Sequence, residues 1–449
     1  MRFGASFHRL FTAAVSTRFA DASRTTAFAL LVASLSADPR VISAVTAASF
    51  LPWLLFGLPV GVLVDRYDKR RAFFIADFSR CLIAVGLTVA VFTGHITVIA
   101  VLACAFALTT LQTVSDSCFY SLLPATVSKE SLGQANARLN MAQSGLGQFA
   151  GAPAGSALYT WHPYIPFLGN VLCFLTAAAA VRGLPKGLPS AAAENEPTGP
   201  ATAKGPAGPA EQGAATQPSS LLGDLRTGLR WIASTPLIRA LACTVGLMNL
   251  TAGLYLGILP FYALHTLKMP AATYGLLSGL TAAAMLGGNF AAGKWMARVR
   301  PAVLCRWAVL LQIVGFIGLA TAPSYQAALP WVLLDGFTAG LWNVPGMTLL
   351  MEHAPEAIRG RVMSAYNTLA VSAVPLGTVL AGLLARGAGN RAPIVAGTVC
   401  LAFAAAVLIW TLRGAAGPDA HTGSTDSTGS TDGTDGTGSA DEAASPVEP

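Results

Sequence analysis

Long apolar runs alternate with short polar breaks along most of this chain. A helix that crosses a bilayer needs about 20 consecutive, mainly apolar residues. By that measure the pattern predicts twelve helical spans in two groups of six. The first group comprises 8–36, 41–63, 72–93, 96–122, 139–160 and 164–184, and the second comprises 237–263, 271–296, 303–322, 326–351, 362–386 and 391–412.

The same pattern predicts four parts. An N-terminal six-helix bundle covers 1–184, and a C-terminal six-helix bundle covers 237–413. The segment between them, 185–236, is an expected cytoplasmic linker, because its first part, 185–220, is rich in Pro, Gly, Ala and Ser and cannot form a packed core. It ends in an amphipathic stretch, 221–235, with the pattern of a helix that lies on the membrane face. The tail, 414–449, is acidic and of low complexity, and we expect it to be disordered.

Composition supports a membrane protein and excludes several other classes. Hydrophobic residues make up 53% of the chain and charged residues only 11%, whereas soluble domains are about one-quarter charged. The net charge of +7 is spread over the breaks rather than gathered on one face, so we expect no nucleic-acid partner. The seven cysteines lie inside apolar runs without a C-x-x-C pair, and we expect neither a metal site nor a cofactor. The predicted fold class is an all-α integral membrane protein.

The basic residues also predict how the chain lies in the membrane. Twelve spans put both termini on one side, and most of the 28 Lys and Arg residues fall in breaks on that side. The breaks on the other side of the membrane contain only Arg40, Lys268, Arg386 and Arg391. By the positive-inside rule both termini are cytoplasmic. We therefore expect a multi-pass protein of the cell membrane.

The most specific motif is "GLPVGVLVDRYDKRR", where an apolar helix ends abruptly in charge. Asp65 in this motif can pair with a basic group or cap a neighbouring helix. Such a contact can hold two halves of a protein shut on the cytoplasmic side and release when they rock. The alternative is a plain topology signal. The residues of this predicted gating motif are Gly61, Asp65, Arg66, Lys69 and Arg70.

These five residues carry the pattern G-x-x-x-D-R-x-x-[RK]-[RK], which resembles the signature of the major facilitator superfamily. Asp68 stands where the family usually has Gly. The resemblance extends over about 8–412, and "PEAIRGRVMSAYNTL" (355–369) is similar to the drug and siderophore exporters of that superfamily, of the enterobactin and macrolide efflux types. It implies two pseudo-symmetric six-helix bundles in a single chain. It also implies that substrate-facing residues lie on spans 1, 4, 7 and 10, where the candidates are Gln112, Asn249, Tyr255, Trp342 and Asn343.

The fifth predicted span contains "GLGQFAGAPAGSAL", which resembles the antiporter motif of the exporters. Glycines four residues apart form a smooth helix face that a partner helix can approach closely. In the family this packing disfavours leak, and plain helix packing is the alternative. The motif residues are Gly147, Gly151, Pro153 and Gly155.

Charged residues interrupt several spans, where each is costly unless it is paired or lines a polar path. In the first span, Arg18, Asp21 and Arg24 follow at steps of three, so neighbouring members can meet on a helix. This stripe is either a static lock or a charged lining of the translocation path. Asp77 and Arg80 have the same spacing in the third span. The predicted charge network comprises Arg18, Arg24, Asp77, Arg80 and Asp116.

Two acids are candidates for proton coupling. Asp21 has arginines on both sides along its helix, whereas Asp335 has no basic residue within one turn. Intramembrane acids often belong to proton relays, and an acid without a cation beside it suits that role better. Asp335 is therefore the first candidate and Asp21 the second. The alternative for Asp335 is a structural acid that is held by a hydrogen bond.

These observations predict a secondary active transporter. A weak repeat, "GVLVDR" at 61–66 and "GKWMAR" at 293–298, relates the two halves, and repeated halves with a site between them are typical of such transporters. No phosphate-binding loop and no catalytic constellation occurs, so we expect no enzyme and no ATP-driven pump. The predicted function is proton-coupled efflux of an amphipathic small molecule, with a nutrient importer of the same fold or a membrane sensor without transport as alternatives.

Overall fold

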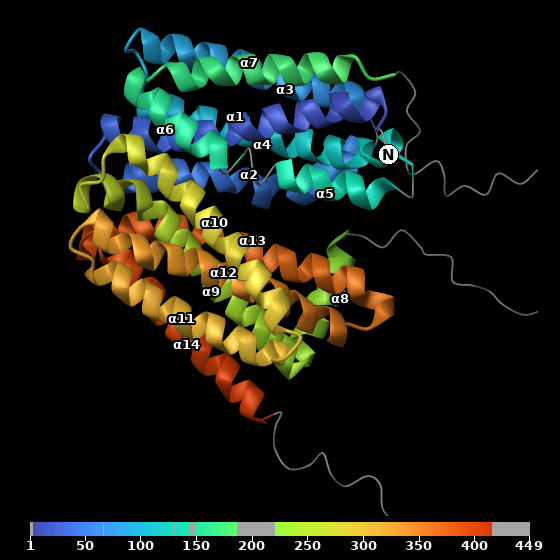
Figure 1. The fold of residues 1–449 in the computed structure, drawn as a ribbon, viewed down its shortest axis with the longest axis vertical. Coiled ribbons are helices and arrows are strands. Elements are labelled where there is room, and N and C mark those ends of the chain that lie inside the picture. The colour runs from blue at the N-terminus through green and yellow to red at the C-terminus, as the bar shows by residue number, and fades with distance from the viewer. Residues whose placement is uncertain are drawn as a thin grey trace, which may run out of the picture.

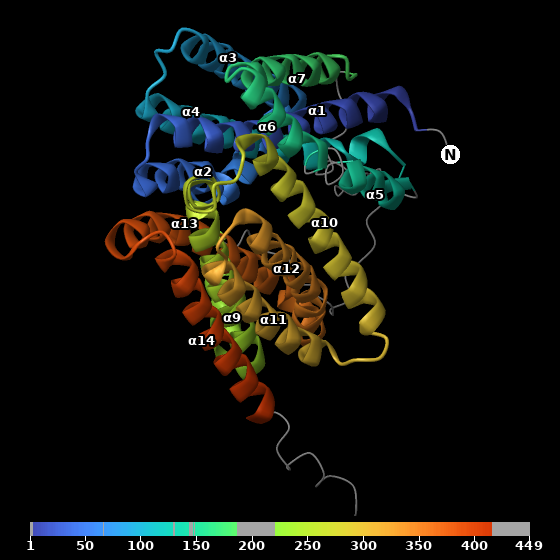
Figure 2. The same ribbon diagram turned by 60° about the vertical axis from the view of Figure 1, so that its left-hand side comes forward.

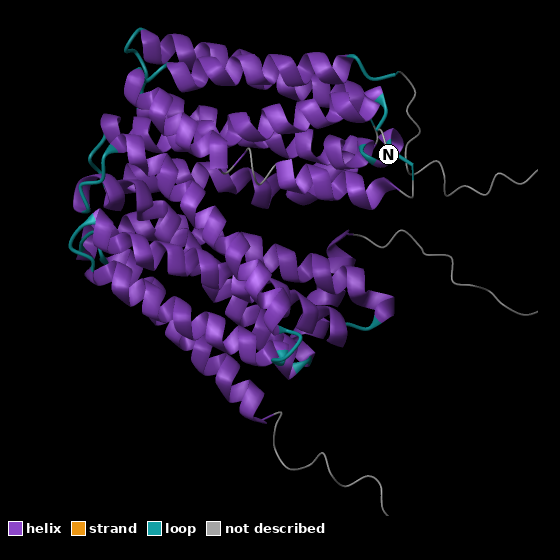
Figure 3. Ribbon diagram, viewed as in Figure 1, coloured by secondary structure: helices purple, strands orange, loops and turns teal. Residues whose placement is uncertain are grey.

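The fold of this chain is described from a computed structural model, which covers residues 3–65, 67–128, 131–142, 147, 149–185 and 221–414. This part is almost entirely helical and contains no strand (Figure 3). The first helices are α1 (Ala5–Leu35), α2 (Pro39–Asp65), α3 (Lys69–Phe92), α4 (Val98–Leu122), α5 (Leu132–Ala142), α6 (Ala152–Trp161) and α7 (Ile165–Arg182). The later ones are α8 (Leu221–Ser234), α9 (Pro236–Phe261), α10 (Ala271–Trp295), α11 (Pro301–Thr321), α12 (Tyr325–His353), α13 (Arg359–Ala388) and α14 (Ala392–Gly414).

Each predicted span coincides with helix in the structure. Within the described residues, 9 helices are long and apolar enough to cross a membrane. Helices α1 and α12 fall outside that set but occupy the first and tenth predicted spans. The fifth predicted span is divided between α5 and α6. The prediction of an all-α membrane fold is confirmed, whereas most of the predicted linker and tail, 186–220 and 415–449, lies outside the described residues.

The helices form two bundles, α1–α7 and α8–α14, which are separate in both views (Figures 1 and 2). Within the first bundle, α7 packs on α1 and α3, and α4 packs on α2 and α3. Within the second, α9 packs on α13 and α14, and α12 packs on α10 and α11. Between the bundles, α2 packs on α13 and α6 packs on α10. The bundles converge at one edge, away from the N-terminus, which we call the far edge; it holds the α1–α2 loop and the start of α10 (Figure 1).

Local sequence explains where several helices begin. Asp68 accepts hydrogen bonds from the backbone N–H groups of Arg70 and Arg71 and so caps the start of α3. Thr97 and Ser324 cap α4 and α12 in the same way. These side chains satisfy N–H groups that have no partner inside the helix. The acid that replaces the family's usual glycine therefore has a structural use here.

The outer faces of the bundles are apolar. Along α3, Ile75, Leu82 and Val89 are each more than half exposed and follow at steps of seven, which places them on one face of the helix. Phe403 and Trp410 repeat the pattern on α14. Because a soluble monomer rarely exposes such continuous apolar surface, these faces fit the hydrocarbon of a bilayer.

The two bundles approach most closely through small residues at the far edge. Ser156 of α6 donates a hydrogen bond to the carbonyl oxygen of Ala272 at 3.0 Å, and Ser43 of α2 donates to that of Gly257 at 2.9 Å. Gly275 of α10 lies directly on α6, where a Cβ atom would overlap the carbonyl oxygen of Ala152. This closeness depends on the absence of a side chain at residue 275.

Replacing Gly275 with Ala should therefore open the far edge. The added methyl group meets backbone rather than a movable side chain, and such overpacking costs about 1–3 kcal/mol. We expect the conformation seen here to lose population by roughly five- to hundredfold against more open forms. The rate at which a membrane-impermeant maleimide labels Ser278→Cys should rise accordingly. Gly86→Ala is the control, since nothing lies within 4 Å of a Cβ there; equal labelling in both variants would contradict the prediction.

Candidate functional site

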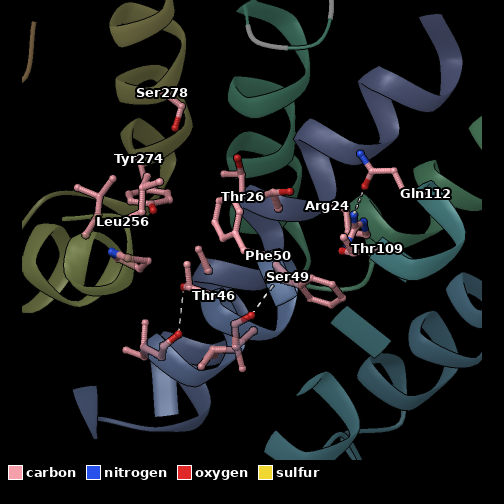
Figure 4. Close-up of a pocket in the computed structure, with 18 of the residues that line it drawn as sticks. Arg24, Thr26, Thr46, Ser49, Phe50, Thr109, Gln112, Leu256, Tyr274 and Ser278 are labelled. Atoms are coloured by element: carbon pink, nitrogen blue, oxygen red, sulfur yellow. Dashed lines mark hydrogen bonds between the residues drawn. The ribbon is translucent and has the colours of Figure 1, made fainter. Parts of the chain in front are cut away.

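A cavity of about 290 Å³ lies between the two bundles, and we call it the central cavity. Helices α1, α2 and α4 supply its wall from the first bundle, and α9 and α10 supply it from the second (Figure 4). Part of the wall is polar: Arg24, Thr26, Ser49, Thr109, Gln112 and Ser278. Part is apolar: Phe28, Phe50, Trp53, Leu256 and Leu259. A pocket with a few polar groups on an apolar wall is the usual form of a small-molecule site.

A second cavity of about 270 Å³, the side cavity, continues along α1. It shares Thr25, Thr26, Gln112 and Ser278 with the central cavity. Its wall adds Arg18 and Asp21, which lie one to two turns before Arg24 on the same helix. The charges of α1 therefore face the space between the bundles, as expected for charged groups in a membrane protein.

The charges on α1, α3 and α4 form two neighbouring sets of ion pairs, one of Arg18 with Asp116 and one that links Asp21, Arg24, Asp77 and Arg80. Asp21 is paired with Arg24 of its own helix, at 3.2 Å, and with Arg80 of α3. Arg80 also pairs with Asp77 at 3.1 Å. Three arginines and three aspartates therefore balance one another inside the first bundle. We call the two sets together the charge network; its members are Arg18, Asp21, Arg24, Asp77, Arg80 and Asp116.

The inner end of the charge network is completely buried. The side chains of Asp77 and Arg80 have no exposed surface. Ser115 donates a hydrogen bond to Asp77 at 2.8 Å, and the Arg80 guanidinium lies 4.1 Å from the centre of the Phe174 ring. Buried ions are tolerated only when such partners replace water. This end of the network therefore holds α1, α3 and α4 together.

The i,i+3 contacts expected from the sequence are present for Asp21 with Arg24 and for Asp77 with Arg80. The expected meeting of Arg18 with Asp21 was wrong. Arg18 instead pairs with Asp116 of α4 at 2.6 Å. The reason is that α4 presents a carboxylate to Arg18 while Asp21 is already shared by two other arginines.

The glycines of the antiporter-like motif pack against α1. A Cβ on Gly151 would lie 2.8 Å from that of Ala22, and a Cβ on Gly155 would overlap the carbonyl oxygen of Ser23. Gly147 faces Arg18 at ordinary contact distance. The carbonyl oxygen of Pro153 accepts a hydrogen bond from Ser156. The motif thus lets α6 approach the charged helix of its own bundle, and any role in preventing leak stays a prediction.

The gating motif is described only in part. The surroundings of Gly61, the side chain of Asp65 and the whole of Arg66 lie outside what the structure describes. Lys69 begins α3. Arg70 donates hydrogen bonds to the carbonyl oxygens of Val181, at 3.2 Å, and of Arg182, both in the last turn of α7. A cation at a helix C-terminus is favourable, so Arg70 joins two helices of the same bundle.

One of the five predicted substrate-facing residues lines the central cavity. Gln112 lies on its wall and accepts a hydrogen bond from Arg24 at 3.3 Å (Figure 4). The other four line neither the central nor the side cavity. Asn249 bonds the backbone of its own helix, Tyr255 and Trp342 are buried, and Asn343 is exposed.

The sequence reasoning missed the walls that α2 and α10 contribute. Thr46, Ser49 and Trp53 follow at steps of three and four on α2, so they share one helix face, and Tyr274 and Ser278 do so on α10. Hydroxyl and aromatic side chains at helical spacing inside an apolar run are a signal that could have found them. Spans 2 and 8 therefore line the cavity in this conformation, whereas span 10 contributes nothing to it.

Asp335 lies apart from the charge network, inside the second bundle. Its carboxylate accepts a hydrogen bond from Gln312 of α11 at 2.8 Å. Within the described part of the chain, no lysine or arginine pairs with it. An intramembrane carboxyl group without a counter-cation is costly to keep charged, which makes it the acid most suited to exchanging a proton.

An ion cluster joins the two bundles at the far edge. Asp38, in the loop before α2, pairs with Arg40 at 2.9 Å and with Arg386 of α13 at 3.2 Å. The hydrogen bond from the Arg40 side chain, with that from its backbone N–H, lowers the pKa of Asp38 to about 2. The stability that ionised Asp38 contributes is fully present above the pKa of an aspartate in the unfolded chain, which is about 4. This stability is lost as the pH falls towards 2. The cluster therefore stays ionised between about pH 5 and 8.

Asp38→Asn should weaken closure at the far edge without changing its pH dependence between about pH 5 and 8. The pair with Arg386 is partly exposed, and exposed pairs contribute up to about 1 kcal/mol. Opening should therefore rise by about two- to fivefold, as measured by maleimide labelling of Ser278→Cys. Acidification to about pH 5 should leave labelling of the parent chain unchanged. A pH-dependent rise that disappears in Asp38→Asn would contradict this assignment.

Two helical bundles with a polar and apolar cavity between them are the architecture of a membrane transporter built from two repeated halves. The chain belongs to the Major Facilitator Superfamily, whose pattern matches residues 10–378. It is accordingly a multi-pass membrane transporter and not an enzyme.

Relatives and solved structures agree with this membership. The chain is 26% identical over 397 residues to the multidrug efflux pump Tap of Mycolicibacterium fortuitum, which covers 82% of this chain and 87% of the relative. It is 28% identical over 172 residues to sugar efflux transporter A of Dickeya chrysanthemi, across 38% of this chain and 43% of the relative.

Two solved structures share the fold. An inward-facing bacterial homologue of the human lysosomal transporter Spinster has a TM-score of 0.69 at 13% identity, across 91% of this chain and 96% of that one. An inward-facing bacterial homologue of the iron transporter ferroportin has a TM-score of 0.69 at 17% identity, across 90% and 98%.

Proposed function

We propose that this chain is a proton-coupled exporter of amphipathic small molecules that works as a single chain in the cell membrane, with both termini in the cytoplasm. The observation that carries the proposal is the central cavity, because its wall combines polar groups with aromatic side chains and comes from both bundles. A site at the interface of two halves changes its access when the halves rock. With cytoplasmic termini, closure at the far edge makes this conformation inward-facing.

Two further observations support export coupled to protons. Asp335 is a partly buried acid whose partner is an amide, and among the described residues no cation pairs with it, which suits reversible protonation during the cycle. The names of two relatives describe efflux. In the proposed cycle, Asp335 takes up a proton from outside and releases it inside, while the charge network keeps the first bundle rigid. Asp21, already shared by two arginines, is the second candidate.

Reconstitution tests the proposal. The full-length chain is placed in liposomes, and a pH gradient is imposed across the membrane while the movement of naphthalene derivatives of different charge is followed. At least one of them should accumulate against its gradient, in the direction opposite to the protons, and the accumulation should collapse with a protonophore. Movement that only follows the substrate gradient, and is unaffected by the pH gradient, would contradict proton coupling.

A further inference from the structure

The wall of the central cavity carries positive charge and no carboxylate. Among the described residues that line it, Arg24 is the one charged side chain. No aspartate of the charge network lines this cavity: Asp21 lines the adjoining side cavity, and Asp77 is fully buried between α3 and α4. A molecule in the central cavity therefore meets the cation of the network first.

The guanidinium of Arg24 is incompletely used. Its Nη2 donates to Asp21 at 3.2 Å and to Gln112 at 3.3 Å, which are both long for charged hydrogen bonds. Its Nε is buried and has no partner, although the side chain is only 3% exposed. Asp21 is shared with Arg80, so Arg24 has only part of one carboxylate. A buried donor without a partner is costly, and an incoming acceptor would relieve that cost.

The rest of the cavity wall includes apolar side chains that suit an apolar group. Phe28, Phe50 and Trp53 come from the first bundle, and Leu256 and Leu259 face them from the second. The Arg24 guanidinium lies 5.6 Å from the centre of the Phe28 ring, so charge and apolar surface are adjacent. In Figure 4, Arg24 and Gln112 lie at one end of the set of cavity-lining side chains, and Leu256 and Tyr274 lie at the other end. A ligand with a polar head and an aromatic tail matches this arrangement.

We propose that the substrates are amphipathic anions, an aromatic or alkyl tail with one carboxylate, and that Arg24 binds the carboxylate. This inference rests on the proposed function, since it names the substrate class of the same cavity. Arginine can donate two parallel hydrogen bonds to a carboxylate. A cationic ligand would place its charge beside Arg24 with no acid on the wall to pair with, which disfavours it.

Binding to the purified full-length chain tests the substrate class without relying on transport. The probes are naphthalene-2-carboxylate, the neutral naphthalene-2-carboxamide and (naphthalen-2-ylmethyl)trimethylammonium, which share one ring system. We expect the carboxylate to bind at least about tenfold more tightly than the cation. Arg24→Gln should weaken binding of the carboxylate by about tenfold or more and change binding of the amide by less than about threefold. The affinity of Arg24→Lys for the carboxylate should lie between that of the unmodified chain and that of Arg24→Gln.

Arg359→Gln is the matched control, since Arg359 is partly exposed and pairs with Glu356 at 3.8 Å on the protein surface. Equal or tighter binding of the cation to the unmodified chain would overturn the proposal, and that comparison needs no variant to fold. Unchanged binding of the carboxylate to folded Arg24→Gln would also overturn it. If the carboxylate binds as expected but no pH gradient drives its movement, the exporter proposal fails and the substrate class stands. If the cation alone is pumped, the exporter proposal stands and the anion class fails.

Discussion

Asp335→Asn is expected to lower proton-driven export by at least about tenfold while leaving exchange of substrate across the membrane intact. Asparagine has nearly the same shape and can still accept the hydrogen bond that Gln312 donates at 2.8 Å, so the second bundle should keep its packing. It cannot bind and release a proton. If the transport cycle requires protonation of this residue, the pH gradient can no longer drive export in the variant. Liposome assays with and without an imposed gradient measure the two activities separately.

Two variants sharpen this test. Asp335→Glu keeps an ionisable group and should retain part of the driven export. Glu352→Gln removes an acid from the same helix, α12, but from an exposed position, and should behave like the parent chain. If Asp335→Asn still responds fully to the pH gradient, Asp335 has no role in coupling. The next variant is then Asp21→Asn, because Asp21 is the acid of the charge network that lines the side cavity.

Arg80→Gln should destabilise the chain more than any other single change in the charge network. Arg80 is completely buried and pairs with both Asp21 and Asp77. Its removal leaves Asp77 with only the hydroxyl of Ser115 as a partner, and breaking a buried ion pair on one side costs about 3–5 kcal/mol. We expect a large fall in the melting temperature of the purified chain and poor recovery from membranes.

An exposed ion pair supplies the control. Arg71 and Asp68 are 3.6 Å apart with 84% and 56% of their side chains exposed, so Arg71→Gln should cost less than about 1 kcal/mol. The double variant Asp77→Asn, Arg80→Gln removes the unpaired carboxylate and should recover part of the lost stability. The assignment would be wrong if Arg80→Gln melted at the same temperature as Arg71→Gln, or if the double variant were less stable than the single one.

The identity of the charged residues was visible in the sequence, but their partners were visible only where spacing is local. Asp77 and Arg80 lie three residues apart on one helix, and so do Asp21 and Arg24, and each pair meets as the helical repeat requires. The partner of Arg18 lies 98 positions away on α4. No periodicity in α1 could have indicated it, because it depends on how two helices are rotated against each other.

The residues that line the central cavity were likewise predictable from the sequence only in part. Membership of the superfamily directed attention to spans 1, 4, 7 and 10, and Gln112 of α4 is indeed on the wall. Asn249, Tyr255, Trp342 and Asn343 are not. In this conformation the bundles meet at the far edge through α2 with α13 and α6 with α10. The wall of the central cavity near that edge therefore comes from α2 and α10 in addition to α1, α4 and α9.

The sequence by itself determined the class of this protein. The thickness of the bilayer sets the length of the apolar runs. The difference between its two sides sets which of the polar breaks carry basic residues. Both features can therefore be recognised without knowledge of tertiary contacts. The tertiary structure alone decided which charges pair across helices, which face of each helix meets the cavity, and that Arg24 rather than an acid faces the central cavity. These features depend on helix rotation and packing, which small residues such as Gly155 and Gly275 permit through contacts that are distant in the sequence.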